Sequence, residues 1–404
     1  MGRVDPKVDE AIQTLNMKDG PTRRRLLTGT GLVSATAAAS ALLAACTSSS
    51  SPKAGSTSSA NSSTAAAAAA VGNFPKTPAW QFWFVNHVTT NPFFVPTIFG
   101  KNDAAALLGL PQPKWGGSET SAIAQMTSYI DTAIAAKADG IATTVINSSP
   151  SDTSFTTPVG AAMKAGIPVV SYNADGPLIK GVATPGTNRL AYVGQALYLS
   201  GQQMGKRIMT LAKPGEVVIF IQTPGTANIQ PRSDGASSVL IPAGYTVTQQ
   251  QTSNNNADVG PAEKSWLLGH GSKIVAALAV DGTSSEQLGP QLEGVGLAGK
   301  IPAGCFDMEP GTLAAVKAGQ VDFTINQDPY LQGFLPVIYL YLFNLTGGLV
   351  LPPNTDTGLA FVDKTNVDSF LSTNTTYEGS NGANAATLVP RSGAISNSIA
   401  TTST

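Results

Sequence analysis

The sequence predicts an α/β protein with two doubly wound, Rossmann-like lobes. From Trp80 onward, short apolar runs alternate with stretches of helical spacing, a pattern typical of βα units on a parallel sheet. The alternation occurs in two series that meet near Thr184-Pro185-Gly186, so we expect one lobe for each series. The chain has 404 residues, of which 42% are hydrophobic, and this is enough to form a core in each lobe.

The first series is predicted to contain three strands and three helices. The second helix is the clearest, because Ile123, Met126, Ile130 and Ile134 recur at helical spacing. The third helix stops at Gly166, directly before an apolar strand. The predicted ranges are strand 81–86, helix 92–108, helix 121–137, strand 140–146, helix 158–164 and strand 167–173.

The second series is predicted from the same alternation of apolar runs and helical spacing. A strongly apolar stretch at 330–345 follows it, and we expect a buried helix there, because the stretch is short for a membrane span and contains Pro336 and Asn344. The predicted strands are 192–194, 216–222, 245–251, 274–281, 300–307 and 322–327, and the predicted helices are 197–211, 232–240, 262–268, 286–295 and 310–318.

Residues 1–45 have the features of an export signal. A paired Arg in Thr22-Arg23-Arg24-Arg25-Leu26-Leu27 precedes a moderately apolar stretch, which resembles a twin-arginine signal. Leu43-Ala44-Ala45-Cys46 resembles the lipobox of bacterial lipoproteins, in which the signal is cut before a Cys that becomes lipid-modified. We expect lipidation at Cys46 and an extracytoplasmic, membrane-anchored protein; a cleaved soluble leader is the alternative.

Residues 46–78, rich in Ser, Thr and Ala, cannot bury enough apolar surface to offset the entropy of ordering them. We expect a flexible linker there and a flexible tail at 391–404.

Composition argues against several classes of function. Charged residues are 12% of the chain, the net charge is −1, and no long basic run follows the leader, so no nucleic-acid partner is expected. The second cysteine, Cys305, is expected to be a lone buried thiol. The sequence has no paired His-Ser-Asp pattern and no metal-ligand cluster, so we predict no catalytic residue, no metal and no cofactor.

Polar residues at the predicted strand ends indicate a binding cleft, because ligands of open α/β sheets bind outside the carboxyl ends of the strands. The segment Asn91-Pro92-Phe93-Phe94 adds an amide for hydroxyl groups and aromatic faces for the C–H surface of a sugar. The candidate ligand-binding residues are His87, Asn91, Phe93, Phe94, Asn173, Arg232, Asp281, Asp307 and Gln327.

Several candidates also have a structural interpretation. The Phe pair could be core, Arg232 could form a surface ion pair, and Asn173 could shape the turn that follows it. Asp307 stands three residues before Pro310, as a helix N-cap does.

From Trp80 to about Leu351 the chain resembles the type I periplasmic binding proteins of the ribose-binding class, the extracytoplasmic subunits of sugar ABC importers. The matching segments are Asn91–Phe94, Ala165–Val170 with Asn173, Tyr192–Gly194 with Gly201 and Gly205, and Thr324–Pro329 with Gly333. The resemblance implies that Asn91 binds the sugar and that Phe93 and Phe94 pack its faces. The other candidates likewise match ligand-contact positions of the family.

The sequence also departs from the family pattern. Where relatives often have Asp-Arg after the fourth strand, this chain has Asn173-Ala174-Asp175, and residues 254–258 lack an aromatic that often covers the sugar. Trp83 or Trp115 could compensate. A linear polyol therefore stays open as the ligand beside a small sugar.

The resemblance implies a protein that performs no chemistry, closes about a hinge on its ligand and then docks, as a monomer, on an ABC permease. Three chain crossings are expected near 182–187, 327–330 and 351–358. The first lobe is then 79–183 plus 329–355, and the second is 184–328 plus 356–390. Rival functions are a sensor that presents its ligand to a membrane receptor, an exported glycoside hydrolase, and a lac-repressor-like regulator.

Overall fold

The structure is a computed structural model that describes residues 75–147, 152–176, 178–179, 182–183, 187–253 and 255–371. These residues belong to one compact unit that begins at Phe74. The export signal, the lipidation at Cys46 and the tail at 391–404 are predictions that lie outside the described residues, as does nearly all of the predicted linker.

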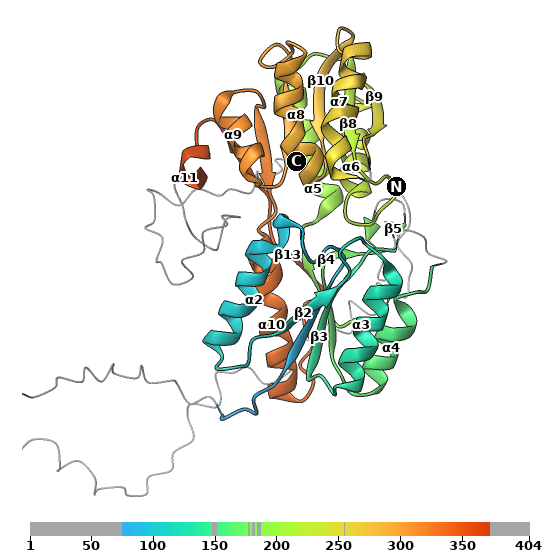
Figure 1. Ribbon diagram of the computed structural model, residues 1–404, viewed down its shortest axis with the longest axis vertical. Coiled ribbons are helices and arrows are strands. Elements are labelled where there is room, and N and C mark those ends of the chain that lie inside the picture. The colour runs from blue at the N-terminus through green and yellow to red at the C-terminus, as the bar shows by residue number, and fades with distance from the viewer. Residues whose placement is uncertain are drawn as a thin grey trace, which may run out of the picture. The chain divides into compact units, whose positions relative to one another are not determined.

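The first lobe is built on a sheet of six parallel strands in the order β2-β1-β3-β4-β7-β13. Helices α2 and α10 cover one face and α3 and α4 the other (Figure 1). The strands are β1 (Phe82–Asn86), β2 (Lys114–Gly117), β3 (Gly140–Val145), β4 (Val169–Asp175), β7 (Tyr192–Gly194) and β13 (Asn354–Asp356). The helices are the 3₁₀ turn η2 (Pro92–Phe94), α2 (Val95–Leu107), α3 (Ile123–Ala135), α4 (Thr156–Lys164) and α10 (Pro329–Thr346).

The second lobe has a six-stranded sheet in the order β14-β12-β11-β10-β8-β9, in which only β14 is antiparallel. Helices α5 and α6 pack on one face, and α7, α8, α9 and α11 on the other. The strands are β8 (Glu216–Ile221), β9 (Thr246–Gln251), β10 (Ile274–Ala279), β11 (Ala303–Phe306), β12 (Phe323–Asn326) and β14 (Ala360–Asp363). The helices are α5 (Leu197–Leu211), α6 (Gln230–Leu240), α7 (Asn256–His270), α8 (Gly282–Gly294), α9 (Pro310–Ala318) and α11 (Val367–Leu371). A short hairpin, β5 (Leu178–Ile179) with β6 (Val182–Ala183), belongs to neither sheet.

In both lobes, glycines allow neighbouring helices to pack closely against each other. A Cβ atom at Gly100 of α2 would lie 2.1 Å from the Tyr330 carbonyl oxygen of α10, and one at Gly333 of α10 would lie 2.0 Å from the Thr97 oxygen. In the second lobe, a Cβ atom at Gly201 of α5 would lie 2.1 Å from the Arg232 carbonyl oxygen of α6. The last contact holds the first turn of α6, and with it Arg232, against α5.

Within the described residues the chain passes between the lobes three times, and one passage lies later than the sequence predicts. Strand β7 pairs in parallel with β4, so it belongs to the first sheet, and the first passage falls at Gln195–Ala196, between β7 and α5. The predicted boundary at 183/184 was wrong, because a strand of three residues gives no indication of which sheet it joins. The other two passages lie between β12 and α10 and between β13 and β14.

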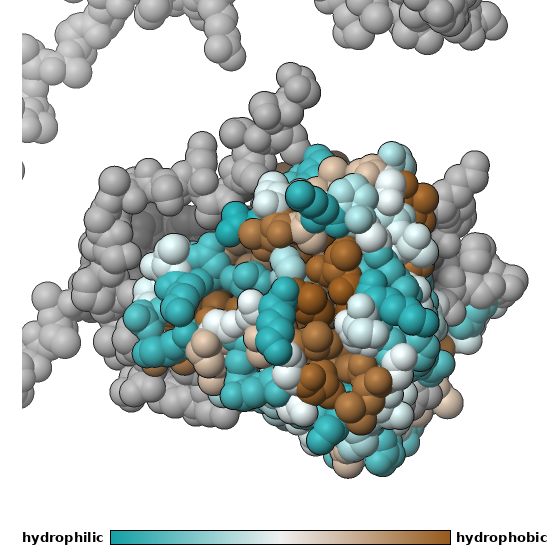
Figure 2. All heavy atoms as spheres, turned by 90° about the horizontal axis from the view of Figure 1, so that it is seen from above, coloured by the Kyte–Doolittle hydropathy of each residue, from teal (hydrophilic) through white to brown (hydrophobic). Residues whose placement is uncertain are grey.

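The predicted buried helix at 330–345 is confirmed as α10, and Cys305 is a free, buried thiol as expected. In the part of the chain that the structure describes, no helix has the length and apolar character needed to cross a membrane. Figure 2 views the end of the body formed by the second lobe, where apolar side chains gather in the middle of the surface.

Candidate ligand-binding cleft

A cleft of about 600 Å³ lies between the lobes, at the carboxyl ends of the parallel strands. Every residue that the sequence analysis proposed as a ligand contact lines it. The first lobe and the second passage contribute His87, Asn91, Phe93, Phe94, Asn173 and Gln327, and the second lobe contributes Arg232, Asp281 and Asp307. A ligand in this cleft would therefore contact both lobes.

One wall of the cleft is aromatic and is built by the turn η2. Asn91 caps this turn, because its Oδ1 accepts a hydrogen bond of 2.9 Å from the Phe93 backbone N–H, while Pro92 fixes the first φ angle. The Phe93 and Phe94 rings meet edge to face with centroids 4.8 Å apart. Phe94 is buried and Phe93 is half-buried, so Phe93 offers the more open aromatic surface.

Neither Trp83 nor Trp115 supplies the aromatic cover for a sugar that residues 254–258 lack. Trp115 packs against Phe84 and Phe94, behind the cleft wall, and Trp83 packs against Tyr129 in the core over α3 and α4. Neither lines the cleft.

His87 follows β1 and is uncharged near neutral pH. Its Nδ1 lies 3.2 Å from the Thr144 hydroxyl, and its ring meets Phe94 edge to face. Burial lowers the pKa of His87 to about 4. A neutral imidazole offers a hydrogen-bonding nitrogen without adding charge to the cleft.

A chain of amide side chains connects the lobes at the base of the cleft. Asn173 donates from Nδ2 to Gln332 Oε1 at 3.0 Å, and Gln332 Nε2 donates to Gln327 Oε1 at 3.2 Å. Gln327 Nε2 donates in turn to Asp307 Oδ1 at 2.5 Å. These bonds run from the end of β4 to the end of β11, so they fix Asn173, Gln327 and Asp307 relative to one another. Asn173 lies within β4 and its side chain bonds Gln332, so its main contact is with α10 rather than with a following turn.

Arg232 is the buried cation of the cleft rather than a surface ion pair. Only 4% of the residue is exposed. Its Nη1 donates to the Val280 carbonyl oxygen at 2.8 Å and lies 3.6 Å from Asp307 Oδ2, and its guanidinium group lies 4.3 Å above the Phe306 ring. The Nε donor is buried with no hydrogen-bond partner among the described residues. Arg232 is held in place while one of its donors is still unused.

The helix-cap interpretation was assigned to the wrong aspartate. Asp281 is the N-cap of α8, because its carboxylate accepts from the Ser284 backbone N–H at 2.9 Å, the Ser284 hydroxyl at 3.0 Å and the Gln222 backbone N–H at 2.8 Å. Asp307 caps no helix, since α9 begins after Glu309. Asp307 instead has a left-handed backbone, with φ of 72°, and turns its carboxylate toward Gln327 and Arg232.

Burial raises the pKa of Asp307 and that of Asp281, and nearby donors oppose the shift in both cases. For Asp307 the main opposing group is Arg232; for Asp281 it is the backbone N–H of Ser284 and then that of Gln222.

The cleft also has polar lining residues that sequence reasoning did not select. Glu309 follows Asp307 by two residues, and Gln222 and Thr223 follow β8, so the strand-end rule alone would have indicated them. Further lining residues come from loops and helix starts. Glu119, Thr120 and Ser121 follow β2, a strand that the sequence analysis did not predict, and the others are Thr226, Asn228, Asn255, Asn256 and Thr283. Within the described ranges, no group of three or more His, Cys, Asp or Glu side chains is arranged to hold a metal ion.

Asp175, at the end of β4, faces away from this cleft. It forms a buried ion pair with Arg189, with Nη2 to Oδ2 at 2.5 Å, and lines a separate cavity of about 310 Å³ together with Tyr192 and Tyr198. Arg189 also donates to the Pro353 carbonyl oxygen and to Asn354 Oδ1, so the pair joins β4 to the segment of β13.

Residues 82–342 match the sequence model of the periplasmic binding protein domain. The chain belongs to this family. It is 42% identical over 322 residues to the xylose/arabinose-binding protein XylF of Sulfolobus acidocaldarius, which covers 77% of this chain and 78% of that protein.

Solved structures of the family share the fold. A solute-binding protein of an ABC transporter from Burkholderia graminis, in complex with D-arabinose, is 25% identical with a TM-score of 0.64, covering 73% of this chain and 99% of the other. The glucose-galactose binding protein GanP of Geobacillus stearothermophilus is 21% identical with a TM-score of 0.62, covering 72% of this chain and 99% of the other, and supports the fold alone. The predicted fold class, two doubly wound lobes of a type I periplasmic binding protein, is confirmed.

Proposed function

We propose that this protein is an extracytoplasmic solute-binding protein that captures a small sugar between its lobes and delivers it to an ABC importer. The strongest support is the 42% identity to a xylose/arabinose-binding protein over 77% of the chain. The relative from Burkholderia graminis was crystallised with D-arabinose. Both names favour a pentose.

The lining of the cleft agrees with a small, neutral, polyhydroxylated ligand. Phe93 offers an aromatic surface for the C–H face of a sugar ring, and Arg232 keeps an unused buried donor for a ring or hydroxyl oxygen. Asp307 and Asn173 offer acceptors from opposite lobes. The ligand would join the lobes and stabilise the closed state only while it is bound, by hinge closure of the kind for which periplasmic binding proteins are a standard example.

The protein would act by binding alone, as a monomer, with a permease as its partner. The leader and Cys46 support export and a lipid anchor on the outer side of the membrane. Mass spectrometry of the mature N-terminus tests the anchor: a diacylated or triacylated Cys46 is expected, and an unmodified N-terminus at another residue would contradict it.

Thermal denaturation of the purified protein with a panel of sugars tests the function. The panel holds D-xylose, L-arabinose, D-arabinose, hexoses, myo-inositol and linear polyols. At about one hundred times its Kd, a ligand that binds only the folded protein adds about 2.7 kcal/mol to the free energy of unfolding, which raises the midpoint. We expect a pentose to raise it most. No shift with any member would contradict the proposal.

A further inference from the structure

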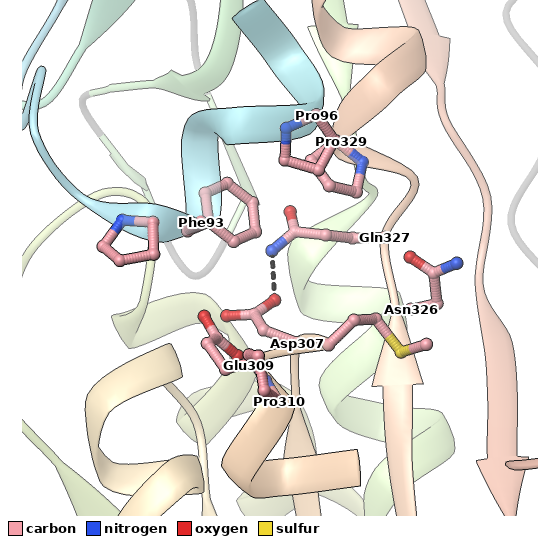
Figure 3. A pocket seen from close by; sticks show the side chains of 10 residues that line it. Phe93, Pro96, Asp307, Glu309, Pro310, Asn326, Gln327 and Pro329 are labelled. Carbon is pink, nitrogen blue, oxygen red and sulfur yellow. Dashed lines mark hydrogen bonds between the residues drawn. The ribbon is translucent and has the colours of Figure 1, made fainter. Parts of the chain in front are cut away.

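Glu309 lies where the two lobes face each other, and the sequence analysis did not select it. It lines the large cleft and an adjoining cavity of about 20 Å³, whose other walls include Pro92, Phe93 and Pro96 of the first lobe. Figure 3 shows the carboxyl groups of Asp307 and Glu309 side by side, pointing toward Phe93. A ligand that packs on Phe93 would therefore reach the Glu309 carboxyl group.

The groups around Glu309 disfavour a negative charge. On its own lobe it faces the carboxyl groups of Asp307, Glu286 and Asp281. The nearby cation, Arg232, is opposed by Asp307, 3.6 Å away. The walls from the other lobe are Pro92, Phe93, Pro96 and Pro329, which have no charge. Burial, and then repulsion from Asp307, raise the pKa of Glu309 well above its usual value.

Local packing leaves one oxygen of the Glu309 carboxyl group without a partner. Its Oε2 atom is buried and accepts no hydrogen bond from the described residues. Its Oε1 atom lies so close to Gly282 that a Cβ atom there would stand 2.3 Å away, so the glycine makes the space for this carboxyl group. Asp281 accepts three hydrogen bonds and Asp307 has Gln327 and Arg232, whereas the Glu309 carboxyl group accepts from its own backbone N–H and keeps Oε2 unpartnered.

A buried carboxyl group that has an unpartnered oxygen and faces other carboxyl groups is more stable as the neutral acid, and a neutral acid has one O–H group that can donate. We propose that Glu309 is a further ligand-contacting residue, which acts as an uncharged carboxylic acid and donates a hydrogen bond to an oxygen of the ligand at the junction of the lobes. The proposal rests on the proposed sugar-binding function and adds to it a contact that selects ligands with an acceptor oxygen at this position.

The contact makes ligand affinity depend on pH. When Glu309 ionises, its donor is lost and a negative charge faces the oxygens of the ligand, so affinity falls as pH rises. Ligand binding should also be accompanied by proton uptake in the pH range where free Glu309 is partly ionised, because the ligand binds the protonated form. His87 does not contribute between pH 5 and pH 9, since its pKa is about 4.

The test is isothermal titration calorimetry with the pentose that gives the largest thermal shift, from about pH 5 to pH 9, in buffers of different ionisation enthalpy. The wild-type protein is expected to take up protons on binding and to lose about tenfold in affinity over this range. Glu309→Gln keeps an uncharged donor, so it should bind within a few-fold of the low-pH wild type and lose most of the proton uptake. Any pH dependence of affinity that remains in Glu309→Gln is due to Asp281 and Asp307.

Two further variants complete the experiment. Glu309→Ala removes the donor and should weaken binding about tenfold at low pH. Glu293→Gln changes an exposed glutamate on α8, outside the cleft, and should keep the wild-type pH profile. Infrared difference spectra between the wild type and Glu309→Gln should show the carbonyl stretch of a protonated carboxyl group, with or without ligand.

Three results would overturn the proposal. They are an unchanged pH profile in Glu309→Gln, a Glu309→Gln protein that binds as weakly at all pH values as the wild type does at high pH, and an infrared spectrum of an ionised carboxylate near neutral pH. If the wild type bound no sugar at any pH, the proposed function itself would be contradicted, and the infrared result would still report whether Glu309 is protonated.

Discussion

Arg232 is the side chain with the most specific arrangement in the cleft. Its position is fixed by the Val280 carbonyl oxygen, Asp307 and the Phe306 ring, and this leaves the buried Nε atom without a partner. A buried donor without a partner is unfavourable unless a ligand satisfies it. The ligand-free protein therefore already holds Arg232 in a position suited to a ligand that accepts a hydrogen bond.

Replacing Arg232 with Ala should weaken pentose binding by about tenfold to a hundredfold, because a hydrogen bond to a charged group contributes about 1.5–3 kcal/mol. Isothermal titration calorimetry measures the loss. Arg207→Ala is the matched control, since Arg207 pairs with Asp363 on the partly exposed side of α5 and does not line the cleft. Equal affinity of the two variants would contradict the role of Arg232.

Glu263 of α7 is a buried carboxyl group away from the cleft. Neither of its oxygens has a hydrogen-bond partner among the described residues, and burial raises its pKa well above 4.5. The pKa of Glu263 is higher in the folded protein than in the unfolded chain. Its contribution to stability is therefore fully present at pH values below the pKa of the unfolded chain, and it is lost as the pH rises through the pKa of the folded protein.

The wild type should therefore lose stability relative to Glu263→Gln as the pH rises above about 5, because Gln does not ionise. Urea denaturation at several pH values gives the difference in unfolding free energy, and its slope with pH is the informative quantity. Glu293→Gln, at an exposed site, should show no such slope. A difference that stays constant with pH would contradict a protonated Glu263.

At the scale of elements, glycine contacts determine where α6 lies. A Cβ atom at Gly201 would clash with the Arg232 carbonyl oxygen at 2.1 Å, whereas a Cβ atom at Gly160 of α4 would meet nothing within 4 Å. An added methyl group therefore does not fit at Gly201, whereas it fits at Gly160.

Gly201→Ala should lower the free energy of unfolding by about 1–3 kcal/mol and weaken pentose binding, because α6 must move and Arg232 moves with it. Gly160→Ala should raise the free energy of unfolding by up to about 1 kcal/mol, through helix propensity alone, and leave binding unchanged. Urea denaturation and calorimetry on both variants check this. Normal binding by Gly201→Ala would show that α6 can shift without moving its arginine.

The ion pair of Asp175 and Arg189 joins β4 to the β13 segment inside the first lobe. Arg189→Ala leaves a carboxylate buried without its cation and should cost about 3–5 kcal/mol of stability, measured by urea denaturation. Lys317→Ala breaks the exposed pair with Asp368 and should change stability by about 0.5 kcal/mol or less. Similar losses in both variants would contradict the importance of burial.

Long elements with a clear period were predictable from the sequence. Helices α5 and α9 begin and end at the predicted residues, and the strands that form the two cores were all expected. Strands β2, β13 and β14 were missed, because they are short, lie at or near sheet edges and are largely polar or half-exposed. Helix α7 begins six residues earlier than predicted: Pro261 lies in its second turn, and Asn255 caps it.

The site was predictable as far as strand ends define it. All the selected residues line one cleft, because parallel strands bring their carboxyl ends to one edge. The sequence could not reveal which carboxyl group caps a helix and which one pairs with Arg232. Asp281 and Asp307 occupy similar positions after strands, and only the following backbone decides that Asp281 caps α8 while Asp307 turns toward Arg232.

At the scale of the whole molecule, the two sheets meet with their strand ends across the cleft, joined by three passages of the chain. The bonds from Asn173 through Gln332 and Gln327 to Asp307 run along the second passage. A ligand held between Phe93 and Arg232 would add contacts between the lobes away from these passages, and this is the physical basis for closure upon binding.

A crystal structure of the protein with the pentose that gives the largest thermal shift tests the central claim most directly. We predict one sugar molecule in the cleft, with its C–H face on Phe93 and hydrogen bonds to Arg232 and Asp307, so that both lobes contact it. A sugar bound by one lobe alone, or in the cavity lined by Tyr192 and Tyr198, would contradict it.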